Sequence, residues 1–290
     1  MSGFSAAWLD LREPADRAAR SSALVEALRA HHPPSAPWTV VDLGAGTGAN
    51  LRYLAPALGG RQQWLLVDED AALLEAARVA LARWAGKLGA AVDADEHGMR
   101  IGAPELGCDV RSVRLDLAHD LPELAVPRGS LVTASALLDL VSAEWLEALA
   151  DICRAAEAEV IFALTYDGRI EVTPGAGDDA FAAECFNRHQ RRDKGFGPAL
   201  GPGAAAAAAR IFASRGYALE EAPSPWRLDG RRDRRLQAEL LHGWLVAALE
   251  AAPESRARLE HWHAEHRRHV DSGAAGMRVG HRDIAGRLRA

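Results

Sequence analysis

The sequence predicts an α/β protein with a doubly wound, mostly parallel sheet of seven strands, a helical segment before the sheet and a helical insertion near the end of the chain. Three observations predict this fold. Short apolar runs alternate with longer amphipathic segments along the chain. The first run ends in a glycine-rich turn at residues 44–48, which leads directly into a helical segment. Polar residues follow five successive runs, at the strand ends where ligands of such sheets bind.

Composition places the chain among globular proteins with one large core. Of its 290 residues, 49% are hydrophobic and 26% are charged, and the formal net charge of −6 argues against a general nucleic-acid binder. The three cysteines lack the spacing of a disulfide framework or a zinc site, which favours a cytoplasmic protein without a metal. We find no signal peptide and no apolar run near the ~20 residues of a membrane span, so we expect no membrane association. The high content of Ala, Arg and Gly is typical of a GC-rich bacterial genome.

Residues 1–37 precede the first strand, with an amphipathic helical region from Trp8 to about Ala30 and a proline-rich break after it. The pattern predicts three further parts: an α/β core over 38–228, a helical insertion over 229–276, and a final strand and tail over 277–290.

The first strand ends in the glycine-rich turn. Val40, Val41 and Leu43 have the apolar, mostly β-branched character of a buried parallel strand. The glycines that follow let the backbone bend sharply and approach a ligand, and residues 50–58 form the next helix, whose free N–H groups point over the turn.

Two known patterns fit this turn. Gly44-x-Gly46-x-x-Ala49 satisfies a relaxed dinucleotide-binding fingerprint. Residues Asp42 to Gly48 fit acid-x-Gly-x-Gly-x-Gly and so resemble motif I of the class I S-adenosylmethionine (SAM)-dependent methyltransferases. An acid two residues before the first glycine suits the second pattern. The resemblance implies a Rossmann-like methyltransferase fold that binds SAM and releases S-adenosylhomocysteine (SAH), with Asp42 facing the positive end of SAM. It covers roughly Trp38 to Thr165.

The second and third strands also end in acids. Asp68 closes the second strand, where a carboxylate can accept both ribose hydroxyls of an adenosyl group, in SAM and NAD equally. A helix over residues 71–85 follows, and then a loop over 86–107. By resemblance, Asp116 after the third strand takes the adenine amine, with Leu117 beside it in the cofactor site; on its own, Asp116 is equally typical of a loop or a helix cap.

The fourth and fifth strands bring further polar residues to the same edge. Ser135 ends the fourth strand and joins the predicted cofactor site. In the family that the chain resembles, the loop after this strand faces the transferred methyl group, and Asp139 is its most reactive residue. The alternative role of Asp139 as a helix cap is weaker, because Ser142 is better placed. Tyr166 follows the fifth strand.

Residues 168–203 are the predicted acceptor loop. Its basic run includes Arg191 and Arg192, which can bind a carboxylate or phosphate, while Asn187 and His189 interrupt the run with neutral donors and acceptors. The alternative is a solvated basic surface. By resemblance the N-terminal segment is a lid over the cofactor, and Arg12 on it can meet an anionic group; alternatively the segment is a surface helix.

The C-terminal part contains predicted helices and two further strands. A helix over 204–215 precedes the sixth strand at 216–228, and two helices follow, near 235–251 and 254–270. The histidines of the last helix lack the spacing of a zinc site. By resemblance, residues 277–284 return as an antiparallel seventh strand beside the sixth.

Together these features predict a SAM-dependent methyltransferase that transfers a methyl group in line to a small, anionic metabolite. Asp139, Tyr166 and His189, in that order, are the candidate bases for an acceptor that arrives protonated. The alternatives are an NAD(P)-dependent oxidoreductase and a SAM-binding regulatory module without catalysis. The acceptor, the methylated atom and the oligomeric state do not follow from the sequence.

Overall fold

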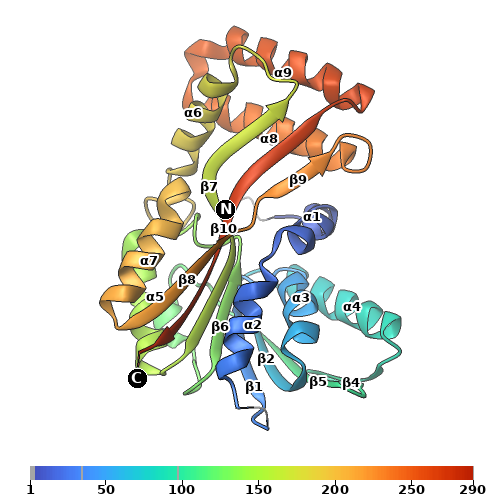
Figure 1. Ribbon diagram of the computed structural model, residues 1–290, viewed down its shortest axis with the longest axis vertical. Helices are drawn as coiled ribbons and strands as arrows, with labels where there is room; N and C mark the ends of the chain where they lie inside the picture. Colours follow the sequence, from blue (N-terminus) through green and yellow to red (C-terminus); the bar gives the residue numbers. More distant parts are fainter. Residues whose placement is uncertain (1–3, 34, 97, 290) are drawn as a thin grey trace.

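The computed structural model describes residues 4–33, 35–96 and 98–289, so the ends of the predicted N-terminal segment and tail lie outside it. Within these residues one sheet contains ten strands, in the order β3-β4-β5-β2-β1-β6-β7-β10-β8, with β9 paired to β10 (Figure 1). The strands are β1 (Trp38–Leu43), β2 (Gly60–Asp68), β3 (Ala91–Ala94), β4 (Met99–Ala103), β5 (Leu106–Arg114), β6 (Leu131–Ser135), β7 (Glu159–Thr173), β8 (Tyr217–Pro223), β9 (Trp226–Asp229) and β10 (Gly276–Leu288).

The centre of the sheet is parallel, as predicted. β1 lies between β2 and β6, β2 pairs with β5, and β6 pairs with β7, all in parallel register. β10 then enters antiparallel between β7 and β8, which confirms the predicted antiparallel return of the last strand. The carboxyl ends of the parallel strands therefore share one edge of the sheet.

The sheet has three strands more than the predicted seven, β3, β4 and β9, and local sequence features explain them. The expected loop over residues 86–107 is mostly a hairpin, because Met99 and Ile101 are buried while their neighbours are exposed, the alternation of a one-sided strand. The predicted sixth strand is two strands, β8 and β9, because Pro225 and the buried Ser224 interrupt it.

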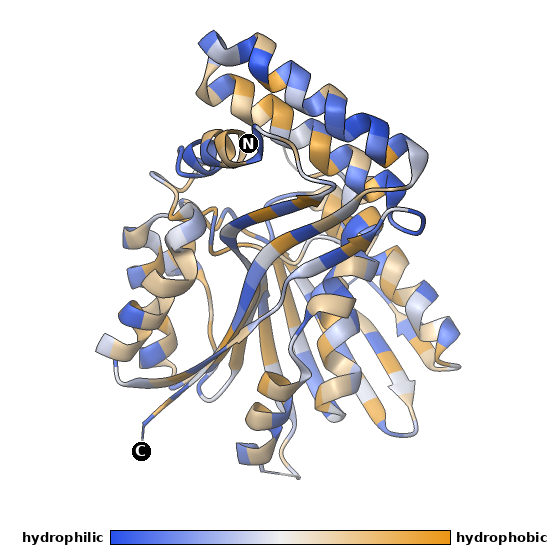
Figure 2. Cartoon of the chain, turned by 45° about the horizontal axis from the view of Figure 1, so that its top comes forward, coloured by the Kyte–Doolittle hydropathy of each residue, from blue (hydrophilic) through white to orange (hydrophobic). Residues whose placement is uncertain are grey.

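Helices cover both faces of the sheet. α2 (Ser22–His31), α3 (Ala49–Leu58) and α4 (Ala71–Lys87) pack on one face through a core that includes Leu51 and Leu54. α5 (Ala143–Ala155) and α7 (Ala204–Ser214) pack on the other face, around Leu146 and Phe212. Figure 2 shows hydrophobic residues along the central strands and alternating hydropathy along the helices.

β7 and β10 continue past the parallel sheet into an upper lobe (Figure 1). There they and β9 meet the helices α6 (Asp179–Gln190), α8 (Arg234–Ala251) and α9 (Arg256–Ser272) around a third core, with Trp244 and Trp262 buried. The predicted acceptor loop is thus, in large part, the end of β7 and the helix α6. The predicted helical insertion corresponds to α8 and α9. These helices pack on the extended end of β7, whose apolar residues continue to Val172.

The N-terminal helical region is two helices rather than one. α1 (Ala6–Ala19) ends at Arg20, and the N–H of Ser21 donates to Asp283 Oδ2 of β10 at 2.8 Å. α1 contacts both the core and the upper lobe: Arg52 of α3 donates twice to Glu13, at 2.5 and 3.0 Å, and Trp226 Nε1 of β9 donates to Asp16 at 3.0 Å. The helix therefore lies at their junction (Figure 1).

None of the helices in the described part of the chain has the length and apolar character needed to cross a bilayer.

Candidate functional site

A pocket of about 810 Å³ lies at the carboxyl edge of the parallel strands, between this edge and α1. Of the predicted site residues, the following line it: Arg12, Gly44, Gly46, Asp68, Asp116, Leu117 and Ser135. Arg12 comes from α1, and the other residues come from the carboxyl ends of four strands, β1, β2, β5 and β6, which the topology brings together because parallel strands end at one edge.

The glycine turn forms the floor of this pocket. Gly44, Gly46 and Gly48 have φ angles of +62°, +53° and +73°, in the left-handed region that favours glycine. The Gly46 N–H donates to Asp68 Oδ2 at 2.8 Å, which fastens the turn to the end of β2. A Cβ on Gly46 would lie 2.9 Å from Leu9 Cδ1 of α1, so the space above this glycine is tight.

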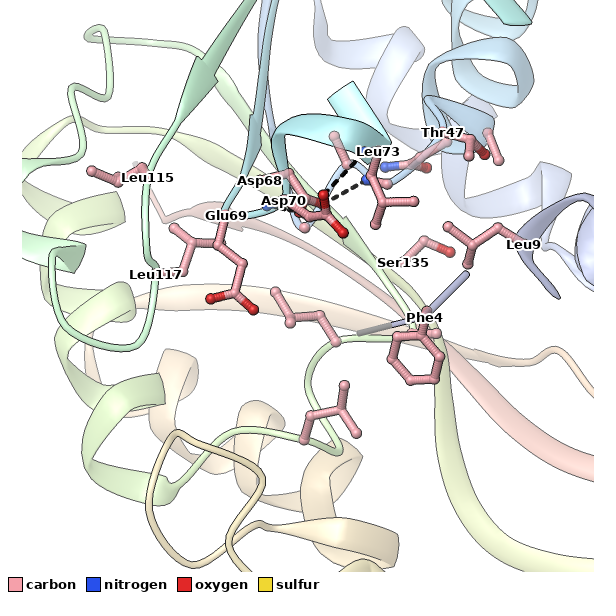
Figure 3. Close-up of a pocket in the computed structure, with 18 of the residues that line it drawn as sticks. Phe4, Leu9, Thr47, Asp68, Glu69, Asp70, Leu73, Leu115, Leu117 and Ser135 are labelled. Atoms are coloured by element: carbon pink, nitrogen blue, oxygen red, sulfur yellow. Dashed lines mark hydrogen bonds between the residues drawn. The ribbon is translucent and has the colours of Figure 1, made fainter. Parts of the chain in front are cut away.

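The end of β2 contributes two acids to the pocket, one of which the sequence analysis missed. Asp68 is buried and also accepts the Asp70 N–H, at 3.0 Å through Oδ1. Glu69 is exposed and lines the pocket, and Figure 3 shows its carboxylate extending into the open space. Its position directly after Asp68 was the only available signal.

Asp116 and Leu117 form the wall after β5. Asp116 Oδ2 lies 2.9 Å from His119 Nδ1, and Oδ1 accepts the Ala118 N–H at 2.9 Å. The hydrogen bond from His119 is the largest cause that lowers the pKa of Asp116, so this carboxylate stays ionised. Trp145 Nε1 of α5 donates to the Leu117 carbonyl at 2.5 Å and so fixes the wall against the core.

Asp42 and Gly48 do not line the pocket, and Asp42 belongs to a buried polar network beside it. Asn50 Nδ2 donates to Asp42 Oδ1 at 2.7 Å and to Thr133 Oγ1 at 3.0 Å, while Arg20 Nη1 donates to Asn50 Oδ1 at 2.7 Å. Asp42 Oδ2 and two donors of Arg20, Nε and Nη2, are buried without a partner. Sequence analysis missed Asn50 and Arg20, because only the fold brings them to Asp42.

Burial raises the pKa of Asp42 from 3.8 to about 7, although Asn50 and Arg20 oppose this. The pKa of Asp42 in the folded state lies above its pKa in the unfolded state. Its contribution to the stability of the folded state is therefore fully present below pH 4 and is lost as the pH rises through 7. We therefore expect Asp42→Asn to be more stable than the wild type at pH 8, by on the order of 4 kcal/mol, and little different at pH 4.

Urea unfolding at both pH values measures this difference. Asp151→Asn is the matched control, because that carboxylate is exposed, with a pKa lowered by Arg215, and offers no such gain. The prediction is contradicted if the free energy of unfolding of Asp42→Asn does not exceed that of the wild type by more at pH 8 than at pH 4.

None of the three predicted catalytic residues, Asp139, Tyr166 and His189, lines the pocket. Asp139 is buried in the loop whose Leu137 and Leu140 line the pocket. Burial raises its pKa to about 6, and its Oδ1 has no hydrogen-bond partner. Tyr166 is also buried, and its hydroxyl donates to Asn187 Oδ1 at 2.8 Å. Burial raises the pKa of Tyr166 well above its usual range, so it keeps its proton at neutral pH.

The structure does not bring the predicted basic run to the pocket. Arg192 Nη2 donates to the Glu250 carbonyl at 2.8 Å, and His189 Nε2 lies 3.0 Å from Glu250 Oε2, both at the end of α8. Arg191 is exposed, and its Nη1 contacts the Asn187 carbonyl at 3.4 Å. The basic run lies at α8 because the free carbonyls at the carboxyl end of a helix attract cations. Phe196 is the member of the predicted acceptor segment that does line the pocket.

No group of three metal-ligating side chains occurs among residues 4–33, 35–96 and 98–289. Of the histidines on α9, His266 is buried with its Nε2 2.5 Å from Asp179 Oδ1 of α6, so it joins two helices of the upper lobe.

Comparison with known proteins gives structural matches only. No protein-family model matches the sequence, and no curated protein matches it. Among solved structures, the chain is similar to a cyclopropane-fatty-acyl-phospholipid synthase-like protein from Lactobacillus casei, with a TM-score of 0.51 and 16% identity over 97% of this chain and 94% of that one. It is also similar to the SAM-dependent methyltransferase from Thiobacillus denitrificans in complex with SAH, with a TM-score of 0.45 and 14% identity over 99% of each chain. At such identities the likeness concerns the fold. The chain has the Rossmann-like fold of methyltransferases, as its sequence predicted.

Proposed function

We propose that the protein binds SAM in the 810 Å³ pocket and transfers its methyl group to a small-molecule acceptor. The observation that carries the proposal is the convergence, in a methyltransferase-like fold, of the glycine turn, Asp68 and the Asp116–Leu117 wall on one cavity. A pocket of this size is within the range of ligand-binding sites.

The residues around the pocket fit this cofactor. Asp68 offers a carboxylate for the ribose hydroxyls, and Asp116 and Leu117 flank the place for adenine. Gly46 leaves room where a Cβ would intrude. Asp42 and Arg20 do not line the pocket, but both hold Asn50, which does line it and offers an amide toward the methionine part. When bound, SAM supplies a methyl group that is already activated on a sulfonium sulfur.

The remaining task of the chain is to hold the acceptor and exclude water. The rest of the pocket is lined by apolar residues from α1, from the residues before it, and from the loops after β6 and α6. They are Phe4, Leu9, Leu137, Leu140 and Phe196. Arg12 adds a cation to this surface. Its Nε and Nη2 donate to Asp16 at 2.9 and 3.1 Å, which fixes the guanidinium and leaves Nη1 for an anionic group.

We therefore infer an acceptor with an apolar body and one anionic group, and the anionic part of this inference rests on Arg12. Asn187, Arg191 and Arg192 are not included, because none of them lines the pocket: Asn187 contacts Tyr166 and Gly168, Arg191 contacts the Asn187 carbonyl, and Arg192 contacts the end of α8. For an acceptor that arrives protonated, Asp139 is the proposed base, because it lies on the loop whose Leu137 and Leu140 line the pocket and its pKa of about 6 is close to neutral.

Calorimetric titration with SAM, SAH and NAD tests the proposal. We expect SAM and SAH to bind one to one and NAD not to bind. Binding of NAD alone favours the oxidoreductase. Binding of SAH without methyl transfer from labelled SAM to any of a panel of carboxylate- and phosphate-bearing acceptors favours the regulatory module.

Asp68→Ala is expected to weaken SAH binding about tenfold to a hundredfold, because a hydrogen bond to a charged group contributes about 1.5–3 kcal/mol. The variant also frees the Gly46 N–H, so thermal unfolding without ligand serves as the control for the fold. Unchanged affinity in a folded variant removes Asp68 from the proposed site.

A further inference from the structure

A second cavity, the α1 groove, lies on the other side of α1 from the cofactor pocket. It has a volume of about 1100 Å³. Leu9, Arg12 and Asp16 of α1 line the first pocket, whereas Leu11 and Ala15 line the groove, so the helix separates the two cavities. The opposite wall of the groove comes from β9, β10 and the start of α8.

The wall of the groove is largely apolar, and its charges are mostly arginines. Leu11, Ala15, Leu228 and Leu236 are among the apolar residues that line it. Four arginines share the groove with only two acids, Asp10 and Asp233; these arginines are Arg227, Arg232, Arg235 and Arg278. In a chain with a net charge of −6, this is a local excess of positive charge.

Two of these arginines directly oppose each other. Arg227 of β9 and Arg278 of β10 are register partners, and both residues line the groove. Like charges at directly opposed positions of an antiparallel pair are destabilising. Arg278 Nη1 donates to Glu171 at 2.9 Å, but its Nε is buried without a partner. An anion between the two guanidinium groups relieves this repulsion.

The other two arginines differ in how far they are neutralised. Arg232 pairs with Asp233 at 2.9 Å. Arg235 is exposed, and, like Arg227, it has no hydrogen-bond or ion-pair partner in the described part of the chain. Arg227, Arg235 and Arg278 thus leave guanidinium donors free beside an apolar wall, an arrangement suited to a carboxylate or phosphate.

We propose that the α1 groove binds a single-chain amphiphilic anion from solution, with its carboxylate or phosphate head between Arg227, Arg235 and Arg278. Its hydrocarbon chain lies along the apolar face of α1, beside Leu11 and Ala15. The size of the groove supports an amphiphile over a bare anion, because a phosphate alone occupies a small part of 1100 Å³. The site is separate from the proposed cofactor pocket and does not depend on its function.

Calorimetry with decyl phosphate, below its micelle-forming concentration, tests the proposal on the full chain. We expect one-to-one binding, with ethyl phosphate at least tenfold weaker, because burial of the chain adds to affinity. Arg227→Gln and Arg235→Gln are each expected to weaken decyl phosphate binding at least fivefold and to leave SAH affinity unchanged. Hydrogen exchange should slow in residues 7–19 and 226–236 on binding.

Arg231→Gln is the matched control. Arg231 is exposed in the turn between β9 and α8 but does not line the groove, so its loss should change the affinity less than twofold. Equal affinities for ethyl and decyl phosphate would overturn the proposal, as would equal effects of the three substitutions in variants that unfold at the wild-type temperature. Binding only to vesicles of anionic lipid, and not to monomeric decyl phosphate, would also overturn it.

Discussion

Gly46→Val should abolish SAH binding, with a loss of more than a hundredfold in affinity, while the protein stays folded. The added side chain meets Leu9 Cδ1 within 2.9 Å of its Cβ and fills the space over the turn that we assign to the cofactor. It also places a β-branched residue at a φ of +53°, which strains the turn. Calorimetry with SAH measures the loss, and circular dichroism verifies the fold.

Gly59→Val separates these two effects. Gly59 has φ +69° and ψ 178°, a conformation essentially restricted to glycine, so the substitution also carries a backbone penalty, but a Cβ there meets nothing within 4 Å and the residue lies outside the pocket. We expect this variant to lose stability and to retain SAH affinity within a factor of three. If both variants lose binding equally, backbone strain rather than occlusion of the pocket explains the result.

Asp139→Asn should lower the rate of methyl transfer about a hundredfold at pH 8, which is within the usual range for loss of a positioned base. Burial raises the pKa of Asp139 to about 6, and only the ionised form accepts a proton. The wild-type rate should therefore rise with pH between about 5 and 7 and then level off. In Asp139→Asn this rise should be absent, while SAH affinity is preserved.

His189→Gln is the comparison variant for this measurement. Its ring contacts Glu250 and Lys194 and does not line the pocket, so we expect a normal rate and a normal pH profile. If the rate of methyl transfer still rises with pH in Asp139→Asn but no longer does so in His189→Gln, the base is His189 instead.

Much of the fold follows from local patterns. The alternation of apolar runs and amphipathic segments predicted the parallel centre of the sheet, and the structure confirms it for the neighbouring strands β5, β2, β1, β6 and β7. The hairpin of β3 and β4 was not predicted, because its alternating residues lie in a short segment dense in Gly, Asp and Glu. The upper lobe was not predicted either, since the continuation of β7 to Thr173 depends on pairing with β10, about a hundred residues later.

The sequence by itself determined that the glycine turn, Asp68, Asp116 and Ser135 share one pocket, because each follows a strand of a parallel sheet and such strands end at one edge. Only the tertiary structure decided the rest of the site. It placed Arg192 and His189 against the end of α8 and buried Asp139 beside the pocket. It also set α1 between two cavities. These outcomes depend on helices that meet from distant parts of the chain, and no local pattern records such contacts.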